Sequence, residues 1–164
     1  MRAMLLVLAT IFAAPVYAAS ANLEADGKAL LRKFLDPKAD RAALTWALKP
    51  TDADVKAVYG EPLGSKLAAF YAQMFKPGTA IGPKDGQTEL LYVYATTAQI
   101  KAGAPVAGEF PGGYAKVAQY MIKDVPIVRF KFVKPGETTG MAFDGLMYVN
   151  GRWVFMPKPW NAGE

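Results

Sequence analysis

The spacing of apolar residues changes once along this chain, from a helical repeat in the first half to alternation near the C-terminus. Apolar side chains recur at every third or fourth position over residues 63–75, which indicates an amphipathic helix. They alternate with basic residues over 128–132, which is typical of a strand with one buried face. Because most expected helices precede the expected strands, the order predicts an α+β fold with N-terminal helices packed on a twisted antiparallel sheet.

Capping residues and prolines set the expected ends of the helices in the first half. Asn22 is expected to cap a first helix, and Asp40 to cap a second that Pro50 closes. Thr51 is expected to begin a third helix, with Gly60 in the left-handed conformation at its C-terminal end. The fourth helix is the amphipathic one, and a Pro-Gly pair ends it. The N-terminal half is therefore predicted to be rich in helix.

The middle of the chain combines one strand with a segment that fits either a helix or a strand. Residues 89–94 are apolar on both faces of a strand, which predicts a strand that is central in the sheet or covered on both sides. Thr96 or Thr97 is expected to cap a helical turn. The Gly-Gly loop that follows lacks the lysine and serine of a phosphate-binding loop, so it predicts a turn in front of a helix. Residues 114–121 fit that helix, which we favour, or a strand.

The dipeptide Asn150-Gly151 predicts a tight hairpin, because a type I′ turn needs two residues with positive φ. The turn sets Val149 opposite Arg152 and makes alternate residues share a face. One face is then expected to carry Asp144, Leu146, Tyr148, Trp153 and Phe155. The other is expected to carry Phe143, Gly145, Met147, Val149, Val154 and Met156. Both sets contain large apolar groups, so helices must cover one face and something else the other.

The complete absence of histidine and cysteine limits the chemistry open to this chain. Catalysis by a Ser-His-Asp or Cys-His system is excluded, and no disulfide can form. Zinc and copper lose their commonest ligands, and the scattered acids lack the spacing of a calcium loop, so we expect neither a metal nor a cofactor. The net charge of +5 is mildly basic. It comes without the dense basic patch of a nucleic-acid-binding protein, so no nucleic-acid partner is expected.

The first eighteen residues are typical of an export signal. Arg2 gives the positive start, residues 4–14 form a short apolar run, and residues 16–18 offer the small side chains that a signal peptidase reads. We therefore predict a signal peptide over residues 1–18, cleaved after Ala18, and a single α+β domain over residues 19–164. The run is too short for a membrane span, so we expect a periplasmic or secreted protein that is not integral to the membrane.

The closing stretch from Gly145 to Trp153, with Phe155 to Trp160 after it, resembles small exported bacterial domains of the NTF2-like or cystatin-like class, of unassigned function. The resemblance extends loosely over the mature chain and implies a cone, with a pocket between the helices and the concave sheet. It also implies that the other sheet face serves for pairing, so a homodimer is one expected assembly. The class contains enzymes, ligand-binding modules and dimerisation modules, so it leaves function open.

Asp144 stands out among the acids because it interrupts an apolar strand, where a lone carboxylate needs a partner. The resemblance implies a catalytic role for Asp144, since NTF2-like isomerases and hydrolases transfer protons with aspartates and tyrosines in their pocket. Asp144 would then be the base, and Tyr148, Tyr92 or Tyr94 the hydrogen-bond donor. In the alternative interpretation, Asp144 pairs with one of the basic residues in the strand over 128–132.

Aromatic side chains are the expected binding groups if the chain is not an enzyme. The candidates for contact with a ligand or partner are Tyr92, Tyr94, Trp153, Phe155 and Trp160. Trp160 follows Pro-Lys-Pro, so it either locks the tail against the domain or anchors a partner. We expect an exported non-catalytic module that holds a small apolar ligand or a protein partner. A small cofactor-free acid–base enzyme is the alternative.

Overall fold

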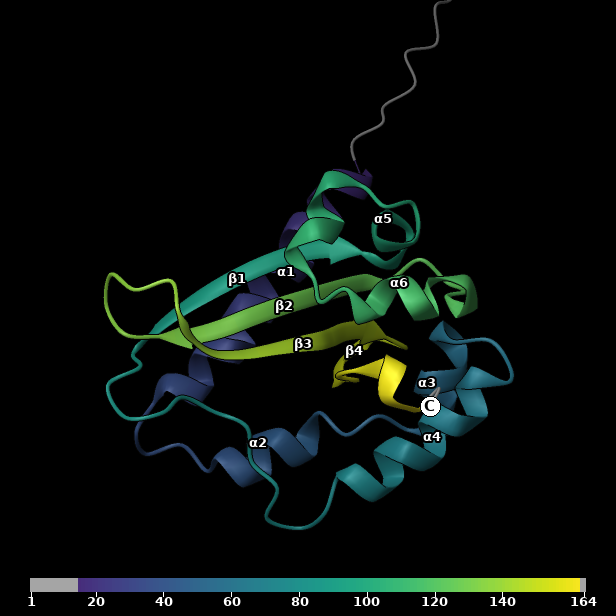
Figure 1. Ribbon diagram of the computed structural model, residues 1–164. Helices are drawn as coiled ribbons and strands as arrows, with labels where there is room; N and C mark the ends of the chain where they lie inside the picture. The colour runs from purple at the N-terminus through teal and green to yellow at the C-terminus, as the bar shows by residue number, and fades with distance from the viewer. Residues whose placement is uncertain (1–14, 163–164) are drawn as a thin grey trace, which may run out of the picture.

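The computed structural model describes residues 15–162, and the apolar run of the predicted signal peptide lies outside the described residues. Helices lie on both sides of a four-stranded antiparallel sheet, which confirms the α+β prediction (Figure 1). The strands are β1 Glu89–Thr96, β2 Pro126–Val133, β3 Gly140–Val149 and β4 Arg152–Phe155. The α-helices are α1 Pro15–Arg32, α2 Arg41–Ala47, α3 Asp52–Val58, α4 Leu63–Met74, α5 Thr97–Lys101 and α6 Gly113–Val117. Short 3₁₀ turns are η1 Lys33–Leu35, η2 Pro105–Glu109, η3 Ala118–Tyr120 and η4 Pro159–Ala162.

Side-chain caps explain where three of the helices begin. Oδ1 of Asp40 accepts a hydrogen bond from the Ala43 N–H at 2.9 Å, as predicted for the start of α2. Thr51 and Asp54 form a reciprocal capping box at the start of α3. Thr96 caps α5 in the same way, and α6 follows the Gly-Gly turn. The helical interpretation of the segment after β1 is therefore confirmed.

Two predicted helix ends are wrong. α1 begins at Pro15, so Asn22 lies inside this helix and does not cap it. Gly60 is not among the glycines with positive φ. Its N–H donates to the Tyr120 carbonyl oxygen at 2.8 Å, beside an isolated antiparallel bridge between Tyr59 and Met121. Pairing with a segment far along the chain therefore replaces the usual glycine cap.

The sheet is a simple meander in the order β1-β2-β3-β4. Asn150 and Gly151 have φ of 51° and 81°, as the type I′ hairpin between β3 and β4 requires. Val149 pairs with Arg152, and Leu146 with Phe155, so the predicted register of this hairpin is confirmed.

A bulge at Gly145 reverses the predicted faces of the first half of β3. Val128 pairs with Leu146, but the next residue of β2, Arg129, pairs with Asp144, so Gly145 is left over. Its φ of 82° is the left-handed value that such a bulge needs. Asp144 therefore lies on the face of Met147, not on the face of Leu146. Phe143 moves to the Leu146 face, so the predicted face assignment is wrong on the N-terminal side of Gly145.

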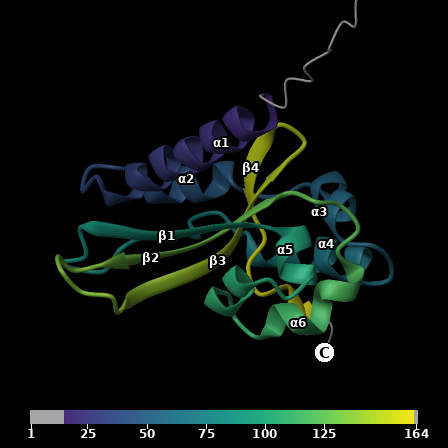
Figure 2. The same ribbon diagram turned by 90° about the horizontal axis from the view of Figure 1, so that it is seen from above.

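The two faces of the sheet are covered by different helices (Figure 2). α1 and α2 lie on one side, where Phe34 packs against Phe132 at a ring-centroid distance of 6.5 Å and Phe143 stacks on Phe130 at 5.2 Å. α5 and α6 lie on the other side at one end of the sheet, and α3 and α4 lie beyond that end. At the other end Leu91 is 36% exposed, so β1, which is an edge strand, is neither central nor covered on both sides along its length, contrary to the prediction.

This arrangement confirms the α+β class, whereas the finer expectation of an NTF2-like or cystatin-like cone is not confirmed. Among residues 15–162, no helix has both the length and the apolar content to cross a bilayer.

Candidate functional site

Asp144 is buried, at 6% exposure, under the last segment of the chain. Its Oδ1 accepts a hydrogen bond from the Tyr114 hydroxyl at 2.8 Å and another from the Lys158 N–H at 3.1 Å. The two basic residues of β2 make other bonds, since Arg129 donates to the Glu109 carbonyl oxygen and Lys131 to that of Thr138. The hydrogen-bond partners of the carboxylate are therefore the Tyr114 hydroxyl and the Lys158 backbone N–H.

Tyr148, the predicted catalytic partner of Asp144, lies on the opposite face of β3 because of the bulge at Gly145. Its ring packs against Trp153 with centroids 5.4 Å apart. Tyr92, the next predicted donor, is paired with Phe130 of β2 and lies on the same face of the sheet as Tyr148. The structure thus separates these tyrosines from Asp144 and brings Tyr114 of α6 to it instead.

Three buried tyrosines are influenced by the charge of the Asp144 carboxylate. Burial, together with the negative charge of Asp144, raises the pKa of Tyr59, Tyr71 and Tyr114 above the usual value of 10.0. The Tyr71 hydroxyl donates to the Pro157 carbonyl oxygen at 3.1 Å. The hydroxyl of Tyr59 has no hydrogen-bond partner among the described residues. Of the three hydroxyls, that of Tyr114 bonds to the carboxylate itself.

Replacing Tyr114 with phenylalanine is expected to lower the free energy of unfolding by about 1.5–3 kcal/mol, because the buried Asp144 carboxylate loses a donor. Urea denaturation near neutral pH measures the change. Tyr148→Phe is the matched control, since it removes a hydroxyl from the other face, and it is expected to change stability by less than about 0.5 kcal/mol. Equal losses in the two variants would contradict the role assigned to Tyr114.

The raised pKa of Tyr114 also predicts that the stability of the protein depends on pH in the alkaline range. A group whose pKa is higher in the folded state contributes stability that is complete below the unfolded value. That contribution is lost as the pH rises through the folded pKa, so the wild type is expected to lose stability above pH 10.0, and Tyr114→Phe to lose less.

Residues 156–160, which follow β4, form a strap across the end of the sheet. The Met156 N–H donates to the Gly145 carbonyl oxygen at 2.8 Å. Lys158 has a φ of 50°, unusual for a residue with a side chain, and in this conformation its N–H reaches Asp144. Asp144 therefore anchors the strap.

Trp160 ends the strap and packs edge-on against Tyr114, with ring centroids 5.2 Å apart. A Cβ at Gly113 would overlap the Trp160 indole ring, so only glycine at this position lets the ring lie so close to α6. Of the two predicted roles of Trp160, this geometry corresponds to locking of the tail.

A surface pocket of about 230 Å³ lies beside Trp160, between the first turn of α4 and the segment formed by α6 and η3; we call it the α4–α6 pocket. Its lining consists of Pro62, Leu63, Lys66, Lys116, Val117, Gln119, Tyr120 and Trp160. Leu63 and Val117 are buried and form its apolar part, whereas Lys66, Lys116 and Gln119 are exposed. None of the described residues that line it is acidic.

The other predicted binding aromatics are largely part of the packing around the sheet. Trp153 and Tyr92 lie under α1, where a Cβ on Gly27 would come within 2.9 Å and 2.6 Å of them. Phe155 is buried in the core, and Tyr94 is half-buried on β1. Trp160 alone among the five predicted residues lines the α4–α6 pocket.

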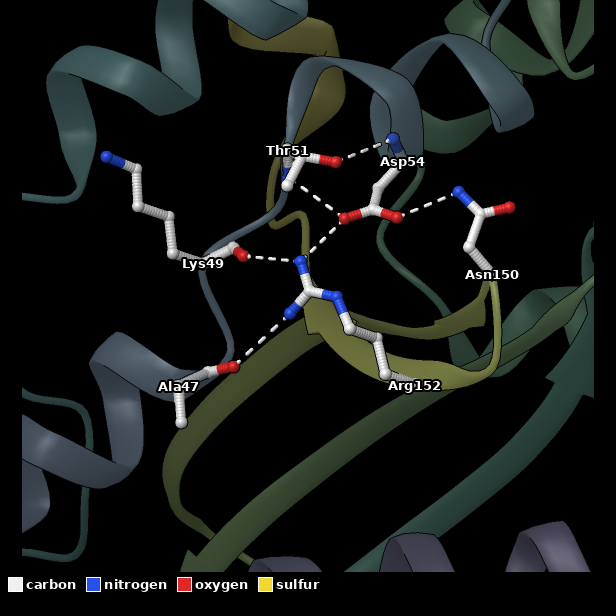
Figure 3. Close-up of polar contacts among 6 residues, drawn as sticks. All are labelled: Ala47, Lys49, Thr51, Asp54, Asn150 and Arg152. Carbon is white, nitrogen blue, oxygen red and sulfur yellow. Dashed lines mark hydrogen bonds and ion pairs between the residues drawn. The ribbon is translucent and has the colours of Figure 1, made fainter.

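A partly buried ion pair that no sequence pattern indicated joins the β3–β4 hairpin to the start of α3 (Figure 3). Nη2 of Arg152 lies 2.6 Å from Oδ2 of Asp54, and the Asn150 amide donates to Oδ1 at 2.9 Å. The Thr51 N–H donates to Oδ2 at 2.9 Å. Arg152 also donates to the Lys49 carbonyl oxygen at 2.9 Å. The capping pattern at Thr51 was the one local signal that could have pointed to Asp54.

Hydrogen bonding sets the ionisation of Asp54. Burial by itself would raise the pKa of this carboxyl group, but hydrogen bonds from Thr51, Asn150 and Arg152 outweigh burial and lower it. Asp54 is thus a carboxylate that holds together segments distant in sequence.

A broader groove of about 470 Å³ borders this ion pair, with Arg152 and Trp46 in its walls. Trp46 is 46% exposed, and the ammonium of Lys49 lies 4.8 Å from its ring centroid. Two of the polar side chains of this groove are thus engaged within it, Lys49 with Trp46 and Arg152 with backbone carbonyl oxygens.

The described residues contain no cluster of three or more acidic side chains that could hold a metal ion. Comparison of the chain with protein-family models, with curated proteins and with solved structures gives no match.

Proposed function

We propose that this chain is an exported, non-catalytic binding module that holds a small ligand in the α4–α6 pocket. One observation carries the proposal: the indole of Trp160, fixed against Tyr114 and Gly113, forms a wall of a pocket with an apolar floor and polar rim. Small-molecule sites usually combine an apolar lining with a few polar groups in this way. Because Trp160 is already held in place, little order has to be created on binding.

The burial of Asp144 favours a binding module over an acid–base enzyme. A general base must come within hydrogen-bond reach of the proton it removes. Asp144 is 6% exposed, and one of its oxygens already accepts bonds from Tyr114 and Lys158. A substrate would have to displace the strap and Trp160 to reach it. We therefore assign Asp144 to the anchoring of the strap.

The proposal predicts different behaviour for two neighbouring glycines. In Gly113→Ala the new Cβ overlaps the Trp160 ring, whereas in Gly112→Ala it meets nothing within 4 Å. We expect native mass spectrometry of protein isolated gently from its own cell envelope to show a bound small molecule in the wild type and in Gly112→Ala. Gly113→Ala is expected to lose this mass and about 1–3 kcal/mol of stability.

Two results would contradict the proposal. One is a wild-type protein that carries no bound small molecule. The other is equal loading of both glycine variants, which would place the ligand away from Trp160. A dimer or hetero-complex without a small molecule would favour a protein partner or a second copy of this chain instead.

A further inference from the structure

We propose that the free edge of β1 is a dimer interface, at which β1 of a second copy of this chain pairs antiparallel to the first and joins the two sheets. β1 is an edge strand of the sheet, and its outer side combines unpaired backbone groups with apolar side chains that are incompletely buried. The interface is independent of the α4–α6 pocket, because no residue of β1 lines that pocket.

The outer side of β1 carries backbone groups that lack a partner among the described residues. Thr97, directly after β1, donates its N–H to the carbonyl oxygen of Val125, directly before β2. Bonding direction alternates from residue to residue in an antiparallel pair, so Leu90, Tyr92 and Tyr94 direct their N–H and C=O groups away from β2. No described residue bonds to these groups, and no helix crosses β1 in Figure 2, which looks down on this edge. They are therefore open to a further strand.

β1 also lacks the features that usually keep edge strands from pairing, which are lysines, prolines, bulges and short length. Its sequence contains no lysine, arginine or proline, and its register with β2 is unbroken over all eight residues. β4, at the opposite edge, is only four residues long. β1 is therefore the edge that is suited to pairing.

A two-fold axis at Tyr92 makes β1 its own complement. Tyr92 then lies opposite Tyr92 of the second copy, and Leu90 lies opposite Tyr94 of the second copy. All three outward residues are thus paired with one another, and two bonds in each pair give about six backbone hydrogen bonds. No other two-fold register pairs these three residues among themselves.

The same register covers the apolar side chains on the other face of β1. Leu91, one of three exposed large apolar side chains among the described residues, comes to lie beside Val93 of the second copy, which is half-buried in the single chain. Glu89 is the one charged residue of β1, and it lies opposite Ala95 of the second copy, so no like charges meet. One strand from each copy makes a small interface, so we expect a weak dimer that depends on concentration.

Crosslinking tests the register, because the chain contains no cysteine of its own. Leu91→Cys and Val93→Cys place one thiol each on the same face of β1. In the proposed dimer these two positions face each other at a Cα separation of about 4.5–5.5 Å, whereas identical positions are about 8 Å apart, too far for a disulfide. Mild oxidation of an equimolar mixture is expected to give about tenfold more linked dimer than either variant alone.

Sedimentation equilibrium of the protein expressed from its full sequence tests the edge itself. Leu90→Pro removes an outward N–H without removing a bond to β2, and each copy loses one bond across the interface. It is expected to raise the dissociation constant of the dimer at least about tenfold, with circular dichroism confirming the fold. If Leu90→Pro fails to fold, Leu91→Lys places a charge against Val93 of the second copy and is expected to act in the same direction. Ile122→Lys is the matched control, because Ile122 is exposed but lies outside β1, and it is expected to leave the dimer unchanged.

The outcomes separate this proposal from the proposed function. A protein that stays monomeric up to about 1 mM overturns the dimer and leaves ligand binding in the α4–α6 pocket standing. Linked dimer from either cysteine variant alone, in the amount that the mixture gives, overturns the pairing at Tyr92. Equal weakening by Leu90→Pro and Ile122→Lys overturns the β1 edge as the interface. A dimer with the expected register but no bound small molecule contradicts only the proposed function.

Discussion

Gly145→Ala is expected to destabilise this protein by about 4 kcal/mol, through a strained φ and a steric overlap that act together. Gly145 has a φ of 82°, and a Cβ there would overlap the carbonyl oxygen of Met156 at the start of the strap. A backbone atom cannot move aside as a flexible side chain can, so the bulge or the strap must give way. Urea denaturation followed by circular dichroism measures the loss.

Gly136→Ala is the control that separates strain from overlap. Its φ is 75°, but a Cβ there meets nothing within 4 Å, so we expect a loss of only about 1–2 kcal/mol. If Gly145→Ala fails to fold, Gly145→Asn gives a second comparison, because asparagine tolerates this φ but still carries the Cβ. A loss at Gly145 no larger than that at Gly136 would show that the bulge does not depend on close contact with the strap.

Asp54→Ala is expected to cost about 3 kcal/mol, near the lower limit for removing one partner of a buried ion pair. The lower limit applies because the Arg152 side chain is 38% exposed and stays hydrated, while that of Asp54 is 4% exposed. Asp52→Ala is the matched control, since Asp52 is an exposed acid in the same first turn. Only its favourable interaction with the helix dipole is lost, about 0.3–1 kcal/mol. Similar losses in both variants would contradict the role of the pair.

The same carboxylate makes stability depend on acid pH. The pKa of Asp54 is lower in the folded state than the ordinary value of 3.8, because its hydrogen bonds outweigh its burial. Its contribution is therefore present above pH 3.8 and is lost as the pH falls through the folded pKa. The stability difference between wild type and Asp54→Asn is expected to shrink in this range. A constant difference between pH 6 and about pH 2 would refute the assignment.

Asp144 illustrates how a correct local signal can lead to an incorrect site. The sequence showed a carboxylate inside an apolar strand and so a need for a partner. Strict alternation placed it beside Leu146 and Tyr148, but the extra residue at Gly145 moved it to the other face. Its donor, Tyr114, comes from a segment 30 residues earlier, and no spacing rule connects the two.

The Asp54–Arg152 pair was missed for the same physical reason. The two residues are 98 positions apart, and each has an ordinary local explanation, as a helix-start acid and a hairpin residue. Their meeting depends on how the hairpin packs against the loop before α3. The α4–α6 pocket likewise forms where the tail, α4 and α6 come together, and of its lining only Trp160 was singled out from the sequence.

Local sequence accounts for the α+β class, the starts of α2 and α3, the helical run of α4 and the register of the β3–β4 hairpin. These features depend on apolar periodicity or on contacts within three or four residues, so a short window of sequence contains their cause. The start of α1, the pairing of Gly60 with Tyr120 and the bulge at Gly145 depend instead on tertiary structure. Tertiary structure also decided the partner of Asp144, because the free energy of these features comes from contacts between segments that the chain brings together only on folding.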